Sequence, residues 1–97
     1  MEFEWDEDKN LKNIAKHKVD FNDAIYLWES CVIEKIDQRN YGNETRYIAM
    51  GEVDGRLFVV VYTWRGAHRR IISARKANDR ERKSYRQALS NAAQIQN

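Results

Sequence analysis

The chain has 97 residues, the length of one ordinary domain, and we expect residues 1–97 to share a single core. Its 33% charged and 42% hydrophobic residues are typical of a globular protein rather than a disordered one. The single cysteine excludes an internal disulfide and a cysteine-type zinc site, and the apolar run 57–62 is too short to cross a bilayer. With no apolar signal segment after Met1, we expect a cytoplasmic protein without membrane association.

The N-terminal third predicts a short strand followed by two helices. Residues 3–5 alternate as a strand, and Asp6 is a suitable N-cap for a helix over roughly 7–18. Asp20 is the next N-cap, for a helix over roughly 21–29 whose apolar residues form one stripe. Helices this short need to pack against the rest of the domain.

The middle of the chain changes to the period of a strand, and the end returns to that of a helix. We expect strands over 31–36, 45–53, 56–64 and 68–76 and a final helix over 79–95. Short turns between strands adjacent in sequence favour antiparallel pairing. The predicted fold class is therefore α+β, with a short N-terminal strand, two helices, a four-stranded mostly antiparallel sheet and a C-terminal helix.

Two turn dipeptides predict the register of the last three strands. Asp54-Gly55, as a two-residue turn, pairs Tyr47 with Tyr62. Gly66-Ala67, as a second such turn, pairs Tyr62 with Ile71 and Phe58 with Arg75, and a slip of one residue there would move every arginine to the other side. In this register one side of the sheet is a core and the other collects Thr45, Tyr47, Val60, Tyr62, Trp64, Arg69, Ile71, Ser73 and Arg75.

That second side has two interpretations. Aromatic rings interleaved with arginines suit the stacking of nucleic-acid bases while phosphates are held. Alternatively, this side is a second small core beneath the C-terminal helix, with the arginine side chains reaching past it to solvent.

Positive charge is concentrated late in the chain. Residues 65–86 hold nine basic side chains against two acidic ones, whereas residues 1–64 hold 8 basic and 13 acidic. Seven of the nine are arginine, which favours bidentate recognition of phosphate or carboxylate. Such a block is typical of a phosphate-binding surface, although a solvated helix face with exposed strand ends has the same composition.

Other candidate residues carry less specific signals. The two histidines, His17 and His68, lie far apart in sequence, so we expect no metal site and no cofactor. His17, near a helix C-terminus, suits either a contact with the last carbonyls or acid–base work. Glu44 and Arg46 fit either a salt bridge or a carboxylate that accepts a proton.

A series of short motifs runs through nearly the whole chain. It comprises Phe3-Glu4-Trp5-Asp6, Lys9, Asn13, Lys16-His17, Val19, Phe21, Glu44-x-Arg46, Gly51, Val60-Val61-Tyr62-Thr63, Arg65-Gly66, Arg70-Ile71-Ile72-Ser73-Ala74-Arg75, Ala77, Arg80-Glu81-Arg82 and Tyr85. In order and spacing this series resembles the BrnT toxin family. Lys18 stands where the family usually has glycine, and a left-handed conformation there would cost about 1 kcal/mol.

The resemblance implies a RelE-like fold and the toxin half of a type II toxin–antitoxin pair. The implied partner is a BrnA-like antitoxin with a ribbon-helix-helix domain, and operator DNA would be bound only through the complex. The implied substrate is RNA. The alternative is a module of the same fold that binds nucleic acid or antitoxin without chemistry, including a degenerate member kept only for its antitoxin contact.

Toxins similar to this one cleave RNA without metal, by attack of a ribose 2′-hydroxyl on the adjacent phosphate. We expect Arg75 and Arg69 to hold the phosphate, Tyr62 to stack or donate a proton, and Glu44 or His17 to act as the base. The residues expected to bind RNA are Arg46, Tyr47, Trp64, Arg65, Ser73 and Lys76.

Overall fold

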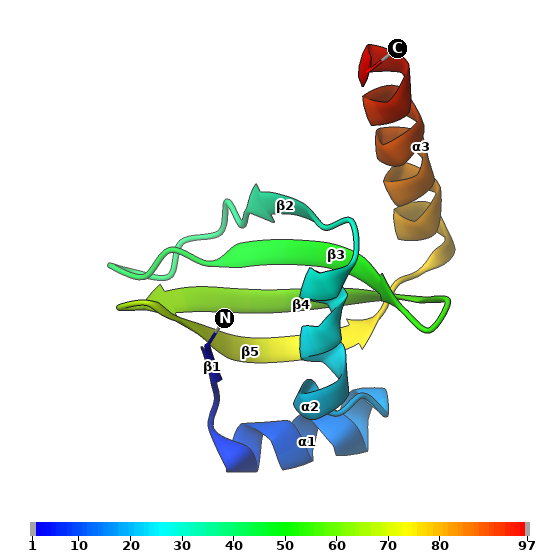
Figure 1. Ribbon diagram of the computed structural model, residues 1–97. Coiled ribbons are helices and arrows are strands. Elements are labelled where there is room, and N and C mark those ends of the chain that lie inside the picture. Colours follow the sequence, from blue (N-terminus) through cyan, green and yellow to red (C-terminus); the bar gives the residue numbers. More distant parts are fainter. Residues whose placement is uncertain (1, 97) are drawn as a thin grey trace.

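The computed structural model describes residues 2–96, with side chains to residue 93. In chain order the elements are β1 (Phe3–Glu4), α1 (Glu7–His17), α2 (Phe21–Ala24), the 3₁₀ helix η1 (Ile25–Glu29), β2 (Ile33–Ile36), β3 (Tyr47–Val53), β4 (Arg56–Arg65), β5 (His68–Lys76) and α3 (Asp79–Gln96) (Figure 1). The α+β class is confirmed. Within the described residues, no helix is both long and apolar enough to span a membrane.

The predicted helix starts are confirmed by their caps. The Asp6 carboxylate accepts hydrogen bonds from the backbone N–H groups of Asp8 and Lys9. Asp20 accepts from the N–H of Asn22, and the pKa of Asp20 is lowered, mainly by the hydrogen bond from the Asn10 side chain. Lys18 adopts the left-handed conformation expected of it, with a φ of 60°.

The sheet has five strands in the order β1-β5-β4-β3-β2, so the expected four-stranded, mostly antiparallel sheet is incomplete. The additional strand is β1, which pairs parallel to β5 at Phe3–Arg69 and Glu4–Arg70. The Arg70 guanidinium also donates to the Glu4 carboxylate at 2.7 Å. The sequence gives no signal for the pairing of so short a strand, because its partner lies 66 residues away along the chain.

Asn13 of α1 closes the remaining edge of β5. Its side-chain amide donates to the carbonyl oxygen of Ala74 at 2.8 Å and accepts from the Ala74 N–H at 3.1 Å. One amide thus satisfies both backbone groups that a further strand would otherwise pair. This contact fixes α1 against the sheet.

The predicted turns are confirmed, but one register is not. Tyr47 pairs with Tyr62, and Tyr62 pairs with Ile71, as expected. A β-bulge at Ile72 then shifts the remaining pairs by one residue, so that Arg75 lies opposite Val59 instead of Phe58. Paired residues share a side of the sheet, and successive residues alternate.

This bulge overturns one central expectation. Ser73 pairs with Val61 and Arg75 with Val59, and both therefore lie on the side opposite Tyr62. Arg69 pairs with Trp64 and stays on the Tyr62 side. The prediction that Arg69, Ser73 and Arg75 share one face is wrong, because the extra residue in β5 reverses the alternation after Ile71.

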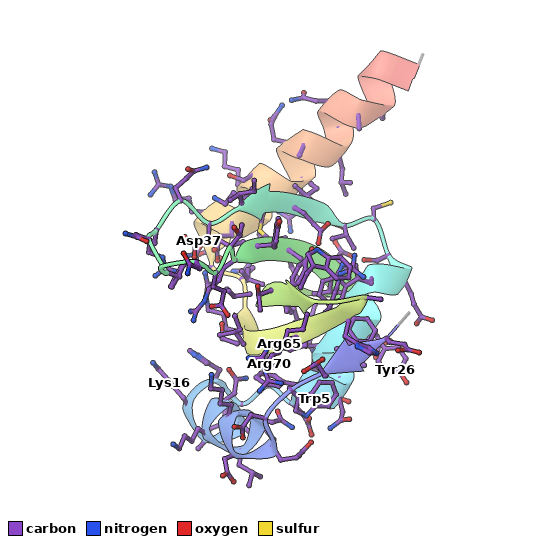
Figure 2. All side chains as sticks on the ribbon, turned by 90° about the vertical axis from the view of Figure 1, so that its left-hand side faces the viewer. Trp5, Lys16, Tyr26, Asp37, Arg65 and Arg70 are labelled. Carbon is purple, nitrogen blue, oxygen red and sulfur yellow. The ribbon has the colours of Figure 1, made fainter. Side chains whose placement is uncertain are left out.

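The Tyr62 side of the sheet is the main core rather than an open surface. Phe21 and Ala24 of α2 and Leu27 of η1 are fully buried against it, together with Val60. Figure 2 shows α2 and η1 on this side of the sheet. Both expectations for this side need correction, because its cover is formed by these N-terminal helices and not by the C-terminal one.

The opposite side, which we call the open face, is covered only at one end. Tyr85 of α3 is buried there beside Leu57 and Val59, while the rest of α3 projects away from the sheet (Figure 1). Across the centre of the open face, one row of paired residues consists of Lys35, Ile48, Val61 and Ser73, and the next of Ile33, Met50, Val59 and Arg75. Apart from Lys35, which is exposed, and Val59, which is buried, these side chains are half-buried.

Gly51 marks the closest approach of β3 to η1. A Cβ atom there would lie 2.9 Å from Ser30 Oγ and 3.0 Å from the Leu27 carbonyl oxygen. Because backbone cannot yield easily, Gly51→Ala should lower the free energy of unfolding by about 1–3 kcal/mol. Urea denaturation measures this, and an unchanged midpoint would show that β3 and η1 pack less closely than described.

Candidate functional site

Arg75 and Glu81 form an ion pair at the edge of the open face. The guanidinium nitrogens of Arg75 donate to the two carboxylate oxygens of Glu81, each at 2.7 Å. The start of α3 fixes this carboxylate, because the Asn78 N–H donates to it at 3.0 Å while the Glu81 N–H donates to Asn78 Oδ1 at 2.8 Å. This reciprocal capping box makes Glu81 a rigid partner for Arg75.

The charges of this pair stabilise each other. The hydrogen bond from Arg75 lowers the pKa of Glu81, and the charge of Lys35 lowers it further. The pKa of Arg75 is raised by the same hydrogen bond. Both groups are therefore ionised at neutral pH, and the Arg75 side chain remains 40% exposed.

The arrangement combines the groups that phosphoryl chemistry requires. Arg75 presents a guanidinium suited to bidentate phosphate binding, and Lys35 adds a second cation on β2. Glu81 supplies a carboxylate, which accepts a proton once its partner is engaged elsewhere. An apolar floor, with Val61 and Ile48 at its centre, separates the two cations.

Arg69 and Tyr62 come together as expected, but inside the protein. The Arg69 guanidinium lies 4.7 Å from the Trp28 ring centroid, 5.3 Å from that of Tyr62 and 4.6 Å from that of Trp64. Tyr62 is 2% exposed and Arg69 9%. This burial favours a structural role, in which Arg69 holds the aromatic rings in place, over phosphate binding.

The Tyr62 hydroxyl donates to Oε1 of Glu34 at 2.7 Å. Burial, reinforced by this hydrogen bond, raises the pKa of Tyr62 to about 12. An unfolded chain loses this proton near pH 10, so stability should fall as the pH rises from about 10 to about 12. Denaturant midpoints measured across this window should fall less in Tyr62→Phe than in the wild type, and equal slopes would contradict the shift.

Glu44 and Arg46 form a salt bridge, the first of the two alternatives expected for them, with Arg46 Nε donating to Glu44 Oε2 at 2.8 Å. The Arg46 guanidinium lies 3.9 Å from the ring centroid of Tyr41, whose hydroxyl donates to the buried Asp37. Hydrogen bonds from Arg39 lower the pKa of Asp37. Glu44 therefore belongs to a charged loop beside β3, away from Arg75.

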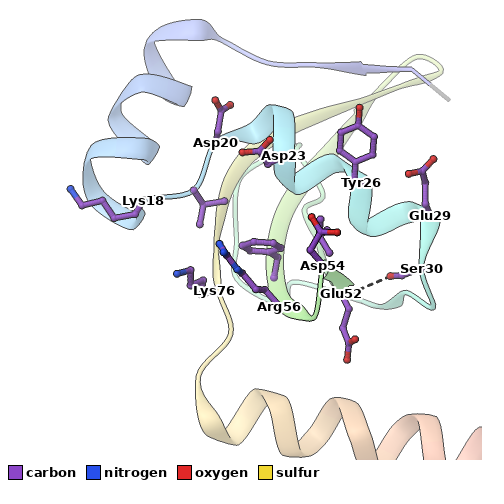
Figure 3. A pocket seen from close by; sticks show the side chains of 13 residues that line it. Lys18, Asp20, Asp23, Tyr26, Glu29, Ser30, Glu52, Asp54, Arg56 and Lys76 are labelled. Atoms are coloured by element: carbon purple, nitrogen blue, oxygen red, sulfur yellow. Dashed lines mark hydrogen bonds between the residues drawn. The ribbon is translucent and has the colours of Figure 1, made fainter.

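The remaining predicted residues divide between two hollows and a helix end. Glu44, Tyr47, Trp64 and Arg65 line one hollow of 310 Å³ at the end of β4. Lys76 lines another, of 640 Å³, whose 13 lining residues include five carboxylates (Figure 3). His17 lies in the last turn of α1. Among the described residues, no group of three or more His, Cys, Asp or Glu is arranged to hold a metal ion.

Two residues of the open face, Glu81 and Lys35, were not predicted as site residues from the sequence. Glu81 could have been found, because Asn78-x-x-Glu81 is a capping-box pattern that directs the glutamate back toward the helix start. Lys35 carries no such signal, since its position on the same face as Arg75 depends on the register of three strand pairs.

Comparison with protein families identifies one family model that matches most of the chain. The family model described as "Ribonuclease toxin, BrnT, of type II toxin-antitoxin system" matches residues 5–81. The chain belongs to the BrnT family. No curated protein matches the sequence. The BrnT match includes both Arg75 and Glu81, which is its last residue.

Membership of the BrnT family confirms the resemblance found in the sequence. This BrnT protein is a ribonuclease toxin of a type II toxin–antitoxin system, and its partner is an antitoxin protein.

Proposed function

We propose that this BrnT toxin cleaves RNA on its open face without metal, and that Arg75 binds the scissile phosphate. The observation that supports this most strongly is the Arg75–Glu81 pair, a partly exposed guanidinium held bidentately by a carboxylate. A phosphate oxygen pair fits the same fork, so RNA competes with Glu81 for Arg75.

This exchange activates the base. When Arg75 turns to the phosphate, Glu81 loses the hydrogen bonds that lower its pKa, and its affinity for a proton rises. Glu81 then takes the proton of the ribose 2′-hydroxyl, whose oxygen attacks the adjacent phosphorus. Arg75 and Lys35 stabilise the charge that develops on the phosphorane.

The second half of the reaction breaks the bond to the 5′-oxygen. Lys35, exposed on β2, donates a proton to the departing oxygen. The products are a 2′,3′-cyclic phosphate and a 5′-hydroxyl. Every group in this scheme belongs to the protein, and on this basis we propose that cleavage needs no metal.

The antitoxin is proposed to be a BrnA-like ribbon-helix-helix protein that acts in the cytoplasm and carries the complex to operator DNA. An acidic segment of that partner would bind Arg75 and Lys35 in place of RNA, which is the electrostatic match the open face favours. The mixed five-stranded sheet, with α2 and η1 packed on one side, supports a RelE-like scaffold for this pair of functions.

Incubation of the purified toxin with RNA, with and without EDTA, tests the proposal. We expect equal cleavage in both samples and cyclic-phosphate ends on the products. Cleavage lost in EDTA would contradict the metal-free mechanism. RNA binding without cleavage would instead favour a non-catalytic nucleic-acid-binding module of the same fold.

A further inference from the structure

Trp64 presents a partly open aromatic ring at the far end of β4. Trp64 is 43% exposed, although its ring packs edge-on against the buried ring of Tyr62, with 5.8 Å between the ring centroids. The Arg69 guanidinium lies 4.6 Å from the Trp64 ring centroid and 4.7 Å from that of Trp28. Trp64 is thus held from within by Arg69 and Tyr62 while part of its surface stays open to solvent.

The open part of Trp64 borders a polar hollow of 310 Å³. Arg65 and Tyr47 line it, and Tyr47 is itself stacked on Tyr62 at 5.4 Å. The other lining residues, Asn43, Glu44, Thr45 and Thr63, offer amide, carboxylate and hydroxyl groups. A flat aromatic surface beside hydrogen-bonding groups and a cation is the combination that binds an unpaired nucleobase and its phosphate.

The hollow and the Arg75 end of the open face are joined by one strand, β4. Val59, the partner of Arg75, and Thr63, which lines the hollow, lie four residues apart, about 13 Å at ~3.3 Å per residue. Thr63 points to the same side of the sheet as Val59, whereas Trp64 points to the other. A strand of RNA bound at Arg75 therefore reaches the end of β4, where a base can turn over the edge onto Trp64.

We infer that Trp64 and Arg65 form a recognition subsite for an unpaired RNA base several nucleotides from the scissile phosphate. This inference rests on the proposed function for the identity of the substrate. Trp64 stacks on the base, and Arg65 binds an adjacent phosphate. Because the ring is fixed in advance by Arg69, little side-chain freedom is lost on binding.

Binding to a fluorescently labelled 2′-O-methyl oligoribonucleotide tests the subsite independently of cleavage, because this RNA lacks the attacking hydroxyl. Trp64→Leu, which keeps an apolar cover over Arg69, should weaken binding about tenfold, and Trp64→Phe should restore most of it. Tyr26→Leu is the matched control, since Tyr26 is an aromatic residue 56% exposed on η1 and should have no effect.

Salt dependence separates the two side chains. Arg65→Gln should reduce the slope of log affinity against log salt by about one, whereas Trp64→Leu should leave it unchanged. Wild-type affinity in Trp64→Leu would overturn the subsite, even if RNA cleavage is intact. If the toxin fails to cleave RNA but its binding still depends on Trp64, the subsite stands and the catalytic proposal falls.

Discussion

Replacing Arg75 by alanine should reduce the rate of RNA cleavage by about a hundredfold to a thousandfold and abolish growth arrest in cells. The loss follows from the removal of the guanidinium that binds the phosphate and stabilises the developing phosphorane charge. The fold should be preserved, because the Arg75 side chain is 40% exposed and exposed ion pairs contribute about 0–1 kcal/mol. Gel assays on a defined RNA and thermal denaturation measure the two effects.

Arg56→Ala is the matched control for this variant. Arg56 is exposed at the start of β4, on the side of the sheet opposite Val59 and Arg75, and lines the hollow rich in carboxylates, so its loss should leave cleavage unchanged. A fully toxic Arg75→Ala would remove Arg75 from the mechanism. Equal losses in both variants would indicate a general effect of positive charge.

Replacing Glu81 by glutamine should lower the cleavage rate by about a hundredfold to ten-thousandfold, the usual contribution of a general base. Glutamine still completes a capping box with Asn78, so the start of α3 should remain intact. The wild-type rate should fall at acidic pH as Glu81 takes up a proton, and the variant should lack this limb. A pH–rate profile of both proteins measures the difference.

Glu52→Gln controls for the loss of one negative charge, since Glu52 is an exposed carboxylate of β3. It should cleave RNA at the wild-type rate. If Glu81→Gln keeps the full rate and the same pH profile, Glu81 only positions Arg75, and the base lies elsewhere.

Local signals in the sequence predicted most of the fold. Aspartates before helices are caps in any context, and Asp54-Gly55 adopts the two positive φ angles, 51° and 78°, of a two-residue hairpin turn. The register of β3 against β4 follows from that turn alone. Helix and strand bounds were therefore predicted within a few residues, but the one helix predicted over 21–29 divides into α2 and the 3₁₀ helix η1.

The candidate site was predicted less well, because its position depends on a β-bulge of a single residue, Ile72. Ile71, Ile72 and Ser73 all fit a regular strand, and no glycine or proline marks the place where Ile72 loses its partner. The bulge moves Arg75 from the core side to the open face. Arg75 was thus predicted as a site residue because of neighbours on the Tyr62 side that it does not have in the structure.

The cover of the sheet was also beyond local signals. The stripe of Phe21, Ala24 and Leu27 predicted a buried helix face but not the side of the sheet that receives it. That choice buries Tyr62 and Arg69 and leaves Lys35 and Arg75 accessible. Glu34, which accepts a hydrogen bond from the Tyr62 hydroxyl, could not be distinguished in the sequence from any other exposed glutamate of an edge strand.

Mapping the bound RNA by NMR tests most directly whether the open face holds the substrate. A 2′-O-methyl oligoribonucleotide titrated into the ¹⁵N-labelled toxin should shift the backbone amides of Lys35, Ser73, Arg75 and Glu81 most strongly. Shifts confined to α2 and η1, with these four amides unchanged, would place the RNA on the helical side and contradict the account.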